Sequence, residues 1–234
     1  MTEGTLLIGS SHNVYDFHTH TFYSDGALSP MEQARRAVVN GYAVLGLTDH
    51  AGVGGVEQLL EALRRDRDVI ERYWPLHVVV GVELTHVPAE ALADAARFAR
   101  DHGAEIVVVH GETPVEPVPE NTNHAAIVSG LVDVLAHPGL LTEADALLAA
   151  HNEVYLELTS RRGHSLTNGH VARVASAVGA RLLVNSDSHE PSDLLTAAFQ
   201  TRVARGAGLI DDALGDALIH NPATLLERVL ANRR

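Results

Sequence analysis

Histidines and acidic residues end or directly follow the short apolar runs of this 234-residue sequence. The residues at these positions are His18, His20, Asp49, His50, Glu83, His110, His137, Asp187 and His189. Imidazole nitrogens and carboxylate oxygens bind divalent Zn, Mn and Fe, and one carboxylate can bridge two ions. The chain has 15 histidines and no cysteine, so a metal would be held by nitrogen and oxygen ligands alone.

The apolar runs have the length and composition of buried strands, which are predicted at residues 14–18, 43–48, 77–82, 105–109, 132–136, 154–158 and 182–185. Helices are predicted between them, including residues 30–40, 56–73, 89–102 and about 123–130. The first begins with a capping box, Ser29-Pro30-Met31-Glu32. Residues 212–234 are expected to add one or two surface helices, with a break at Asn221-Pro222. About seven strand–helix units predict an α/β fold of the TIM-like barrel type, in one domain over residues 1–234.

The carboxyl ends of the strands of a parallel barrel meet on one rim, which brings side chains from distant parts of the sequence into one site. With Asp25 added, the candidate metal ligands are His18, His20, Asp25, His50, Glu83, His110, His137, Asp187 and His189. They suffice for two or three divalent transition-metal ions, with Zn, Mn and Fe left open. Any single histidine could instead be a core or capping residue, but a rim position that recurs strand after strand favours a shared site.

The order of these residues resembles the motifs of the PHP (polymerase and histidinol phosphatase) superfamily over about residues 14–192. The matching segments are DFHTHT at 16–21, SDG at 24–26, LTDH at 47–50, GVE at 81–83, VHGE at 109–112, AHP at 136–138 and NSDSH at 185–189. The resemblance implies a distorted barrel of seven strand–helix units, the PHP fold, and a trinuclear site that hydrolyses phosphate esters.

The resemblance also implies how the ligands would be shared. One ion would be held by His18, His20, Glu83 and Asp187, a second by Glu83, His110 and His137, and a third by Asp25, His50 and His189. Some members have a histidine where this chain has Gly26, so Asp25 would serve in its place. Asp187, or a nearby histidine such as His189, is a candidate for passing protons during catalysis.

Arg161, Arg162 and His164 follow the sixth strand and are predicted to bind a substrate phosphate, with one of the two arginines facing inward. The alternative is a solvated loop with ordinary surface charges. The proline-rich segment 114–119 is predicted to be a flap over the site. The expected substrate is a small phosphorylated molecule, a phosphomonoester rather than a diester. The residues do not distinguish histidinol phosphate from nucleotides, other monoesters or DNA ends.

Other histidines and one aspartate have different expected roles. His12, His77, His86, His102, His151 and His220 are interpreted as structural or surface residues, and His124 and His170 are left undecided. Asp49 precedes His50 and is expected to orient an imidazole.

Two alternatives to a phosphoesterase are considered. An amidohydrolase-type C–N hydrolase also uses His-x-His on a first strand and a final Asp in a barrel, but Asp25, the TDH segment and the SDSH ending favour a phosphoesterase. A non-catalytic PHP module would be expected to have lost ligands, whereas this set looks complete.

The composition excludes several classes of protein. A net charge of −13 makes a general nucleic-acid-binding surface unfavourable. A hydrophobic fraction of 46% is enough for a substantial core, and no apolar run has membrane-spanning length. Residues 1–13 lack the pattern of a secretory signal, and a cytoplasmic location is expected. The sequence makes no prediction of oligomeric state.

Overall fold

A parallel β-sheet that curls into a nearly closed barrel forms the centre of the protein. The computed structural model describes residues 12–231 and 233. The strands are β1 (Val14–Asp16), β2 (Tyr42–Leu47), β4 (His77–Leu84), β5 (Ile106–His110), β6 (Val134–Ala136), β7 (Tyr155–Thr159) and β8 (Leu182–Asn185), hydrogen-bonded in that order. The short β3 (His50–Ala51) also pairs with β4. Every pairing is parallel, as the apolar runs predict.

Among the described residues, the barrel closes at the carboxyl ends of its first and last strands. Beyond β1 and β8, Thr19 and Ser188 form an isolated parallel bridge. The His20 amide donates to the Ser188 carbonyl at 2.9 Å, and the Asp187 amide donates to the His18 carbonyl at 2.9 Å. The residues that close the ring are therefore the predicted ligands themselves or their neighbours.

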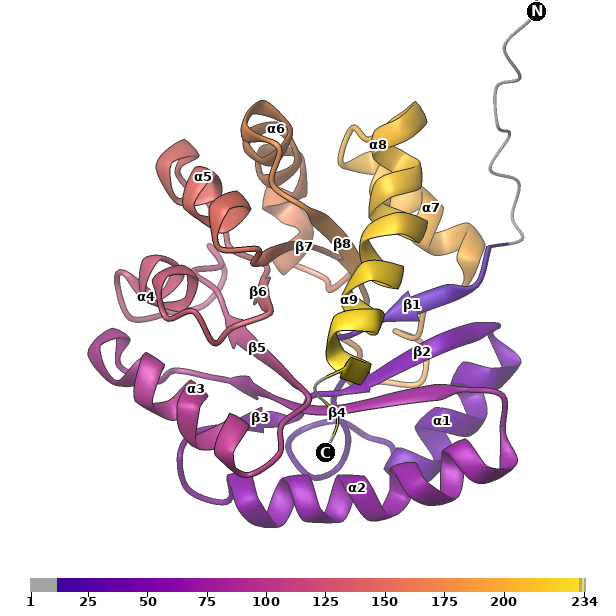
Figure 1. Ribbon diagram of the computed structural model, residues 1–234. Helices are drawn as coiled ribbons and strands as arrows, with labels where there is room; N and C mark the ends of the chain where they lie inside the picture. The colour runs from indigo at the N-terminus through magenta and orange to yellow at the C-terminus, as the bar shows by residue number, and fades with distance from the viewer. Residues whose placement is uncertain (1–11, 232, 234) are drawn as a thin grey trace, which may run out of the picture.

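Helices follow the strands, and most of them surround the ring (Figure 1). They are α1 (Pro30–Val39), α2 (Val56–Tyr73), α3 (Leu92–Asp101), α4 (Thr122–Val128), α5 (Glu143–His151), α6 (Asn168–Val178), α7 (Ala197–Gly206), α8 (Asp211–Gly215) and α9 (Asn221–Ala231). Short 3-10 turns at Ala89–Ala91 and His164–Thr167 precede α3 and α6. At the start of α1 the Ser29 hydroxyl accepts a hydrogen bond from the Glu32 amide, as the capping box predicts. The α/β barrel prediction is confirmed.

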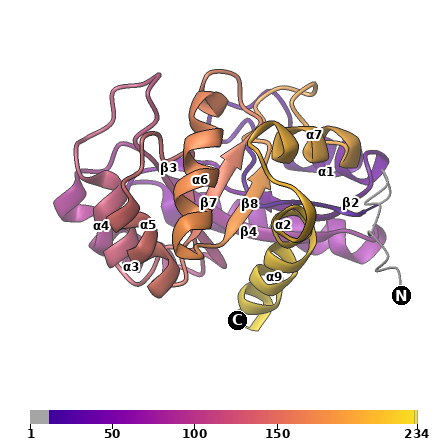
Figure 2. The same cartoon turned by 90° about the horizontal axis from the view of Figure 1, so that it is seen from above.

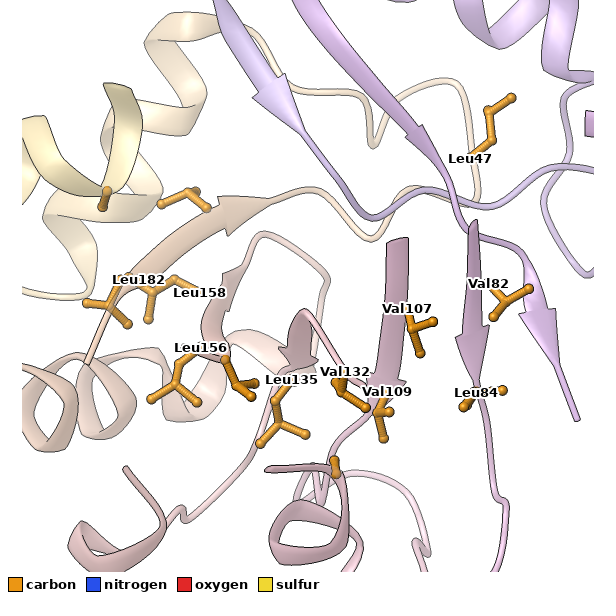
Figure 3. Close-up of a cluster of buried hydrophobic side chains, with 14 of the residues drawn as sticks. Leu47, Val82, Leu84, Val107, Val109, Val132, Leu135, Leu156, Leu158 and Leu182 are labelled. Atoms are coloured by element: carbon orange, nitrogen blue, oxygen red, sulfur yellow. The ribbon is translucent and has the colours of Figure 1, made fainter. Parts of the chain in front are cut away.

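Alternate residues of each strand face two different apolar layers. Val82, Val107, Leu135 and Leu156 belong to the larger cluster between the sheet and its helices, part of which is shown in Figure 3. Their neighbours along the strands, such as Val108, point into the barrel and form a smaller cluster. The period of two residues in a strand separates the layers.

The C-terminal helix α9 closes the barrel at the end opposite the strands' carboxyl ends, on the far side from the loops that follow the strands (Figure 2). Leu225 and Val229 are buried and join the inner cluster with Phe17 and Val44. The predicted helix is present and exposes Thr224 and Glu227, but the prediction of a surface helix did not include the burial of its other face in the barrel. The expected break at Asn221-Pro222 was wrong, because a π-helical turn at Asp216–His220 runs directly into α9. Residues 232 and 234 lie outside the described part of the chain.

Along residues 12–231 the structure has no helix that is both long enough and apolar enough to cross a lipid bilayer. Most of the segment interpreted as lacking a secretory signal, residues 1–11, lies outside the described residues. The cytoplasmic location stays a prediction.

Candidate metal centre

The inward-facing rows of the barrel change from apolar to polar as the strands approach the rim. These rows run from Val79 to Glu83, from Ile106 to His110, from Tyr155 to Glu157 and from Leu183 to Asn185. Because side chains alternate along a strand, residues two or four apart share the inner face. The same periodicity that builds the inner core therefore directs Glu83 and His110 into the site.

His18, His20, Glu83 and Asp187 form the deepest group of candidate ligands, and all four are buried. Oε1 of Glu83 lies 3.4 Å from Nε2 of His18, and Oε2 lies 3.6 Å from Nε2 of His20. Nε2 of His20 also lies 3.2 Å from Oδ1 of Asp187 and 3.1 Å from Nε2 of His18. Ligand atoms that share one ion at 2.0 to 2.2 Å lie about 3 to 3.5 Å apart. Three of these separations fall in that range, whereas the 3.6 Å contact of His20 with Glu83 and the 3.8 Å separation of Nε2 of His18 from Oδ1 of Asp187 lie slightly beyond it.

Glu157 controls which ring nitrogen of His18 faces the group. Nδ1 of His18 lies 2.8 Å from Oε2 of Glu157, and both side chains are fully buried. The same carboxylate oxygen accepts from the Asn185 side-chain amide at 2.9 Å. A histidine that donates through Nδ1 presents Nε2 as the acceptor, which is the usual arrangement behind metal-ligating histidines. Glu157 is absent from the predicted site residues, although its place in the inner row of β7 is a signal that could have found it.

A more exposed group lies beside the first. Oδ1 of Asp25 is 3.2 Å from Nε2 of His189 and 3.6 Å from Nε2 of His50. These residues together with His20 form a potential four-ligand group. Nδ1 of His189 lies 3.0 Å from the Asp187 backbone carbonyl, so Nε2 is the nitrogen that faces Asp25. The structure thus brings together the three residues that the resemblance assigns to a third ion and adds His20.

Gly26 leaves no room for a side chain next to this group. A Cβ atom at this position would lie 2.4 Å from the backbone oxygen of His20. Any larger residue would push against the backbone that holds His20 in place. In this chain, therefore, the carboxylate of Asp25 reaches the group from the preceding position.

The third group differs from the one that the resemblance implies. His110, His137 and His164 offer ring nitrogens that lie within 4.8 Å of one another. Glu83 contacts His137, with Oε1 and Nε2 at 3.7 Å, but it forms no ion pair within 4 Å of His110. The carboxylate closest to His110 in this group belongs to Glu116, whose Oε2 is 3.2 Å from Nε2 of His110. Neither Glu116 nor a ligand role for His164 was predicted, since both depend on loop conformation.

Two of the candidate ligands have unusual backbone conformations. The φ angles are 26° for His137 and 53° for Asp187, in the region that favours glycine. Non-glycine residues in this region cost about 1 to 3 kcal/mol each and concentrate at functional sites. The strain at these two positions is consistent with a site that fixes side-chain direction at the expense of backbone energy.

The buried charges strongly perturb one another. Burial raises the pKa of Glu83, but the neighbouring His18 and His50 more than offset this and hold it well below its ordinary value. Burial lowers the pKa of His50, yet the nearby Glu83 carboxylate raises it to about 9 overall. Burial also lowers the pKa of His20 and His137 well below the usual value for histidine. Burial thus favours the uncharged form of these two rings, which is the form that binds a metal.

Burial likewise raises the pKa of Asp187, to about 7, despite the opposing effect of His18. Perturbed ionisable groups that gather in one cleft are typical of functional sites. Asp187, a predicted proton-transfer residue, is one of them.

Asp49 has a different role from the one expected. Its Oδ1 accepts hydrogen bonds from the Thr21 amide at 2.7 Å and the Ser24 hydroxyl at 2.8 Å. The expectation that Asp49 orients an imidazole was therefore wrong. Asp49 instead fixes the loop that leads from His20 to Asp25.

The predicted phosphate-binding residues lie in different environments. Arg161 is half-buried, and its Nη1 lies 3.2 Å from Oδ2 of Asp193. Arg162 is exposed, and His164 is buried against His137, with ring centroids 4.3 Å apart. The exposed His86 also approaches the site, with its ring 5.1 Å from that of His110. His86 is thus a rim residue as well as a surface residue.

A cavity of about 840 Å³ lies at the opposite end of the barrel and is not part of this centre. Its lining includes Arg100, Asp133, Arg228 and Arg233. These charges are already paired: both Arg100 and Arg228 bind Asp133, and Arg233 binds Glu71. The network ties α9 and the chain end to the starts of the strands.

The donor set tests whether a metal fits the candidate centre. Several buried polar atoms of the centre have no hydrogen-bond partner among the described residues, namely Oε1 of Glu83 and the Nδ1 atoms of His20, His110, His137 and His164. Oε2 of Glu83 has one close ion-pair contact, with Nδ1 of His50 at 2.6 Å. A buried polar atom without a partner is costly, by about 1 to 3 kcal/mol. A cation between Glu83 and the surrounding imidazoles would satisfy that carboxylate. The residues therefore fit bound divalent ions.

The fold and this rim of histidines and carboxylates define an α/β barrel with a candidate multinuclear metal centre. The sequence profile of the PHP domain matches residues 16–200, and the chain belongs to the PHP domain family.

The chain is also similar to several known proteins. An uncharacterized protein of Methanocaldococcus jannaschii is 46% identical over 92% of this chain and 99% of its own length. A probable phosphatase of Caldanaerobacter subterraneus subsp. tengcongensis is 29% identical over 75% of this chain and 76% of its own length. Among solved structures, the Aspergillus niger ochratoxinase superposes with a TM-score of 0.57 at 13% identity, covering 91% of this chain and 71% of its own. At this identity, the likeness is one of fold alone.

Proposed function

We propose that this protein is a metal-dependent phosphoesterase that acts on small phosphorylated molecules. The observation that carries the proposal is the buried Glu83 carboxylate, whose oxygens lie within 4 Å of His18, His20, His50 and His137. Membership of the PHP domain family and a relative named as a probable phosphatase support the same activity.

The residues present would hold two or three divalent ions. The first would lie among His18, His20, Glu83 and Asp187, and another among Asp25, His50 and His189. Bound there, such ions supply Lewis acidity, lower the pKa of bound water and neutralise charge that develops on a phosphate. Zn, Mn and Fe all remain compatible with nitrogen and oxygen ligands.

The chain's own groups orient the ligands and move protons. The carboxylate of Glu157 accepts a hydrogen bond from Nδ1 of His18, which leaves Nε2 of this histidine directed toward Glu83. Asp187 is the first candidate for proton exchange with a leaving group, since its carboxylate lies among the candidate ligands, with Oδ1 3.2 Å from Nε2 of His20. His189 lies next to it and remains the second candidate for this task, with Nδ1 3.5 Å from Oδ1 of Asp187.

A phosphomonoester, such as a nucleotide or a histidinol-phosphate-like molecule, is the proposed substrate. The half-buried Arg161 is the better placed of the two arginines to bind its terminal phosphate, since Arg162 is exposed. A net charge of −13 opposes binding of long polyanions. We therefore do not propose a general nucleic-acid surface.

Metal removal and restoration test the proposal. Protein stripped with a chelator is incubated with Zn, Mn or Fe, and phosphate release is measured from monoesters, nucleotides and short oligonucleotides. We expect no release without metal, restored release with at least one ion, and loss of activity in Glu83→Gln. Glu120→Gln is a matched control, because Glu120 is exposed and outside the candidate centre.

Two outcomes would contradict the proposal. Hydrolysis of amide substrates without phosphate release would favour a C–N hydrolase, which shares the barrel fold. Metal binding without hydrolysis of either substrate class would favour a non-catalytic module.

A further inference from the structure

The barrel has a seam between its first and last strands. Among the described residues, β1 and β8 share no ladder of backbone hydrogen bonds, although β1 pairs with β2 and β8 pairs with β7. Each of the two strands therefore has an open edge that faces the other. Buried backbone amides and carbonyls need hydrogen-bond partners, so the groups along the seam must be satisfied in another way.

The side chain of Gln200 joins the two strands. Gln200 lies on α7 and is 1% exposed. Its amide nitrogen donates to the Tyr15 carbonyl of β1 at 2.9 Å and to the Val184 carbonyl of β8 at 2.8 Å. Its Oε1 lies 3.1 Å from Nε2 of His12, which directs the NH2 group toward the two carbonyls. One side-chain amide therefore uses both of its N–H groups to hold both strands.

Nearer the rim, two residues that end the strands also bridge the seam. The Phe17 amide donates to Oδ1 of Asn185 at 3.0 Å. In the opposite direction, the Ser186 amide donates to Oδ1 of Asp16 at 3.1 Å. Both acceptor side chains are fully buried. Three side chains thus take the place of a strand ladder, and Gln200 is the one that comes from outside the sheet.

The seam separates two parts of the deepest ligand group. His18 and His20 follow β1, whereas Asp187 follows β8, and Nε2 of His20 lies 3.2 Å from Oδ1 of Asp187. In a ladder, the backbone itself fixes neighbouring strands about 4.8 Å apart. Across the seam, this distance depends on the side chains that bridge it. Misplacement of a functional group by about 1 Å can cost about 100-fold in activity, so the bridging side chains bear directly on the site.

We propose that Gln200 is a positioning residue of the metal centre. By holding one carbonyl of each strand, it sets the spacing between the histidines that follow β1 and the aspartate that follows β8. Gln200 lies outside every segment that resembles the PHP motifs, on a helix that supplies no candidate ligand. The role rests on the proposed metal centre but requires no particular substrate.

Gln200→Met tests this role, because methionine has a side chain of the same length without an N–H donor. Each apoprotein is loaded with Co²⁺, whose visible absorption spectrum reports the geometry of its ligands. We expect Gln200→Met to change that spectrum and to weaken one class of bound ion by about tenfold or more in chelator competition. Gln33→Met is the matched control and should keep the wild-type spectrum and affinity. Gln33 is also 1% exposed, but its Nε2 has no hydrogen-bond partner among the described residues.

Amide hydrogen exchange tests the seam without metal. In the Gln200→Met apoprotein, the Phe17 and Ser186 amides should exchange faster than in the wild type, because the seam opens more often. The Val107 amide, which donates to the Asp133 carboxylate at 2.8 Å in another part of the barrel, should not change. Gln200→Asn keeps the amide on a shorter side chain and should lie between wild type and Gln200→Met. If Gln200→Met does not fold, Gln200→Asn compared with Gln33→Asn carries the same test.

Leu225→Ala distinguishes positioning from a purely structural role, because it removes buried apolar contacts at the opposite end of the barrel. It should lower stability and keep the wild-type Co²⁺ spectrum. If Gln200→Met also loses stability but keeps the wild-type spectrum and affinity, the positioning role is wrong. Unchanged exchange at Phe17 and Ser186 would overturn it as well. If the expected effects occur but the wild type releases no phosphate, only the proposed function is contradicted.

Discussion

His18 and Glu157 form a fully buried pair at the floor of the metal centre, with Nδ1 of the histidine 2.8 Å from Oε2 of the carboxylate. Among the side chains of the candidate ligands, Glu157 is hydrogen-bonded to that of His18. Its other oxygen, Oε1, accepts from the backbone amide of His137 at 3.3 Å. One carboxylate behind the site therefore orients His18 and supports the strained residue His137.

Replacement of Glu157 should weaken metal binding without removing a ligand. In Glu157→Gln the neutral amide no longer favours the Nδ1-protonated form of His18 as strongly. We expect a 10- to 100-fold loss of affinity for one ion, the usual effect of removing such a partner. Chelator-competition titration measures this loss. Glu153→Gln, an exposed change two residues before β7, is the control, and equal affinities in both variants would contradict the role assigned to Glu157.

Glu83→Ala should lose more metal than His189→Ala. The Glu83 oxygens lie within 4 Å of four histidines, whereas Nε2 of His189 lies beside one carboxylate, that of Asp25, at 3.2 Å. We expect elemental analysis after gel filtration to show fewer ions per chain in Glu83→Ala. Equal metal content in the two variants would argue against a carboxylate shared between ions.

Much of the centre could be predicted because its residues lie at strand ends, where local sequence determines position. His18, Glu83 and His110 follow apolar runs whose period of two residues already indicates an inner face. Glu157 lies inside such an apolar run, where a single charged residue does not by itself indicate a site. Its role becomes clear only in the barrel, where the inward-facing residues are polar near the rim. Glu116 lies on a loop, and no local sequence pattern predicts the direction in which a loop side chain points.

The role of α9 could not be predicted for a related reason. Its apolar residues repeat with helical spacing, which is equally typical of a helix on the outer surface. Only the three-dimensional closure of the barrel shows that one end is left open and that Leu225 and Val229 fill it.

Gly26→Ala should destabilise the protein and weaken the group around Asp25. A Cβ atom there would lie 2.4 Å from the His20 carbonyl oxygen, which is backbone and cannot move aside cheaply. Overpacking of this kind costs about 1 to 3 kcal/mol. Urea unfolding and metal titration measure the two effects. Gly52→Ala is a matched control, because a Cβ at Gly52 meets no atom within 4 Å, and an equal effect at both positions would contradict the steric argument.

Leu225→Ala should lower stability but leave the metal centre intact. Leu225 is fully buried in the inner core, at the end of the barrel opposite the ligands. Removing such a side chain costs about 2 to 5 kcal/mol of unfolding free energy. Urea unfolding of the apoprotein measures the loss, and Leu140→Ala serves as control because Leu140 is 72% exposed. A cost as small as that of the control would show that α9 does not stabilise the barrel.

The last prediction concerns how a phosphate is held, and Arg161 is its subject. Arg161 is half-buried with Nη1 3.2 Å from Oδ2 of Asp193, and the same oxygen accepts from the backbone amide of His189 at 3.1 Å. A phosphate dianion that bound Arg161 would compete with Asp193 for the guanidinium. Charge-assisted hydrogen bonds are worth about 1.5 to 3 kcal/mol, so Arg161→Ala should reduce kcat/KM for a monoester by about 10- to 150-fold.

A diester carries less charge and offers fewer free oxygens, so its kcat/KM should fall less than that of the monoester. Arg162→Ala is the matched control, since Arg162 is exposed and should be nearly neutral. Because Arg161 could act only by positioning His189 through Asp193, Asp193→Asn is assayed alongside it, together with metal content. If Arg161 binds the phosphate, Arg161→Ala keeps its metal and loses activity mainly on the monoester. Asp193→Asn then keeps the wild-type preference for the monoester over the diester. If both variants lose activity equally on both esters, Arg161 supports the His189 loop, and the phosphate is held by the metals and other residues.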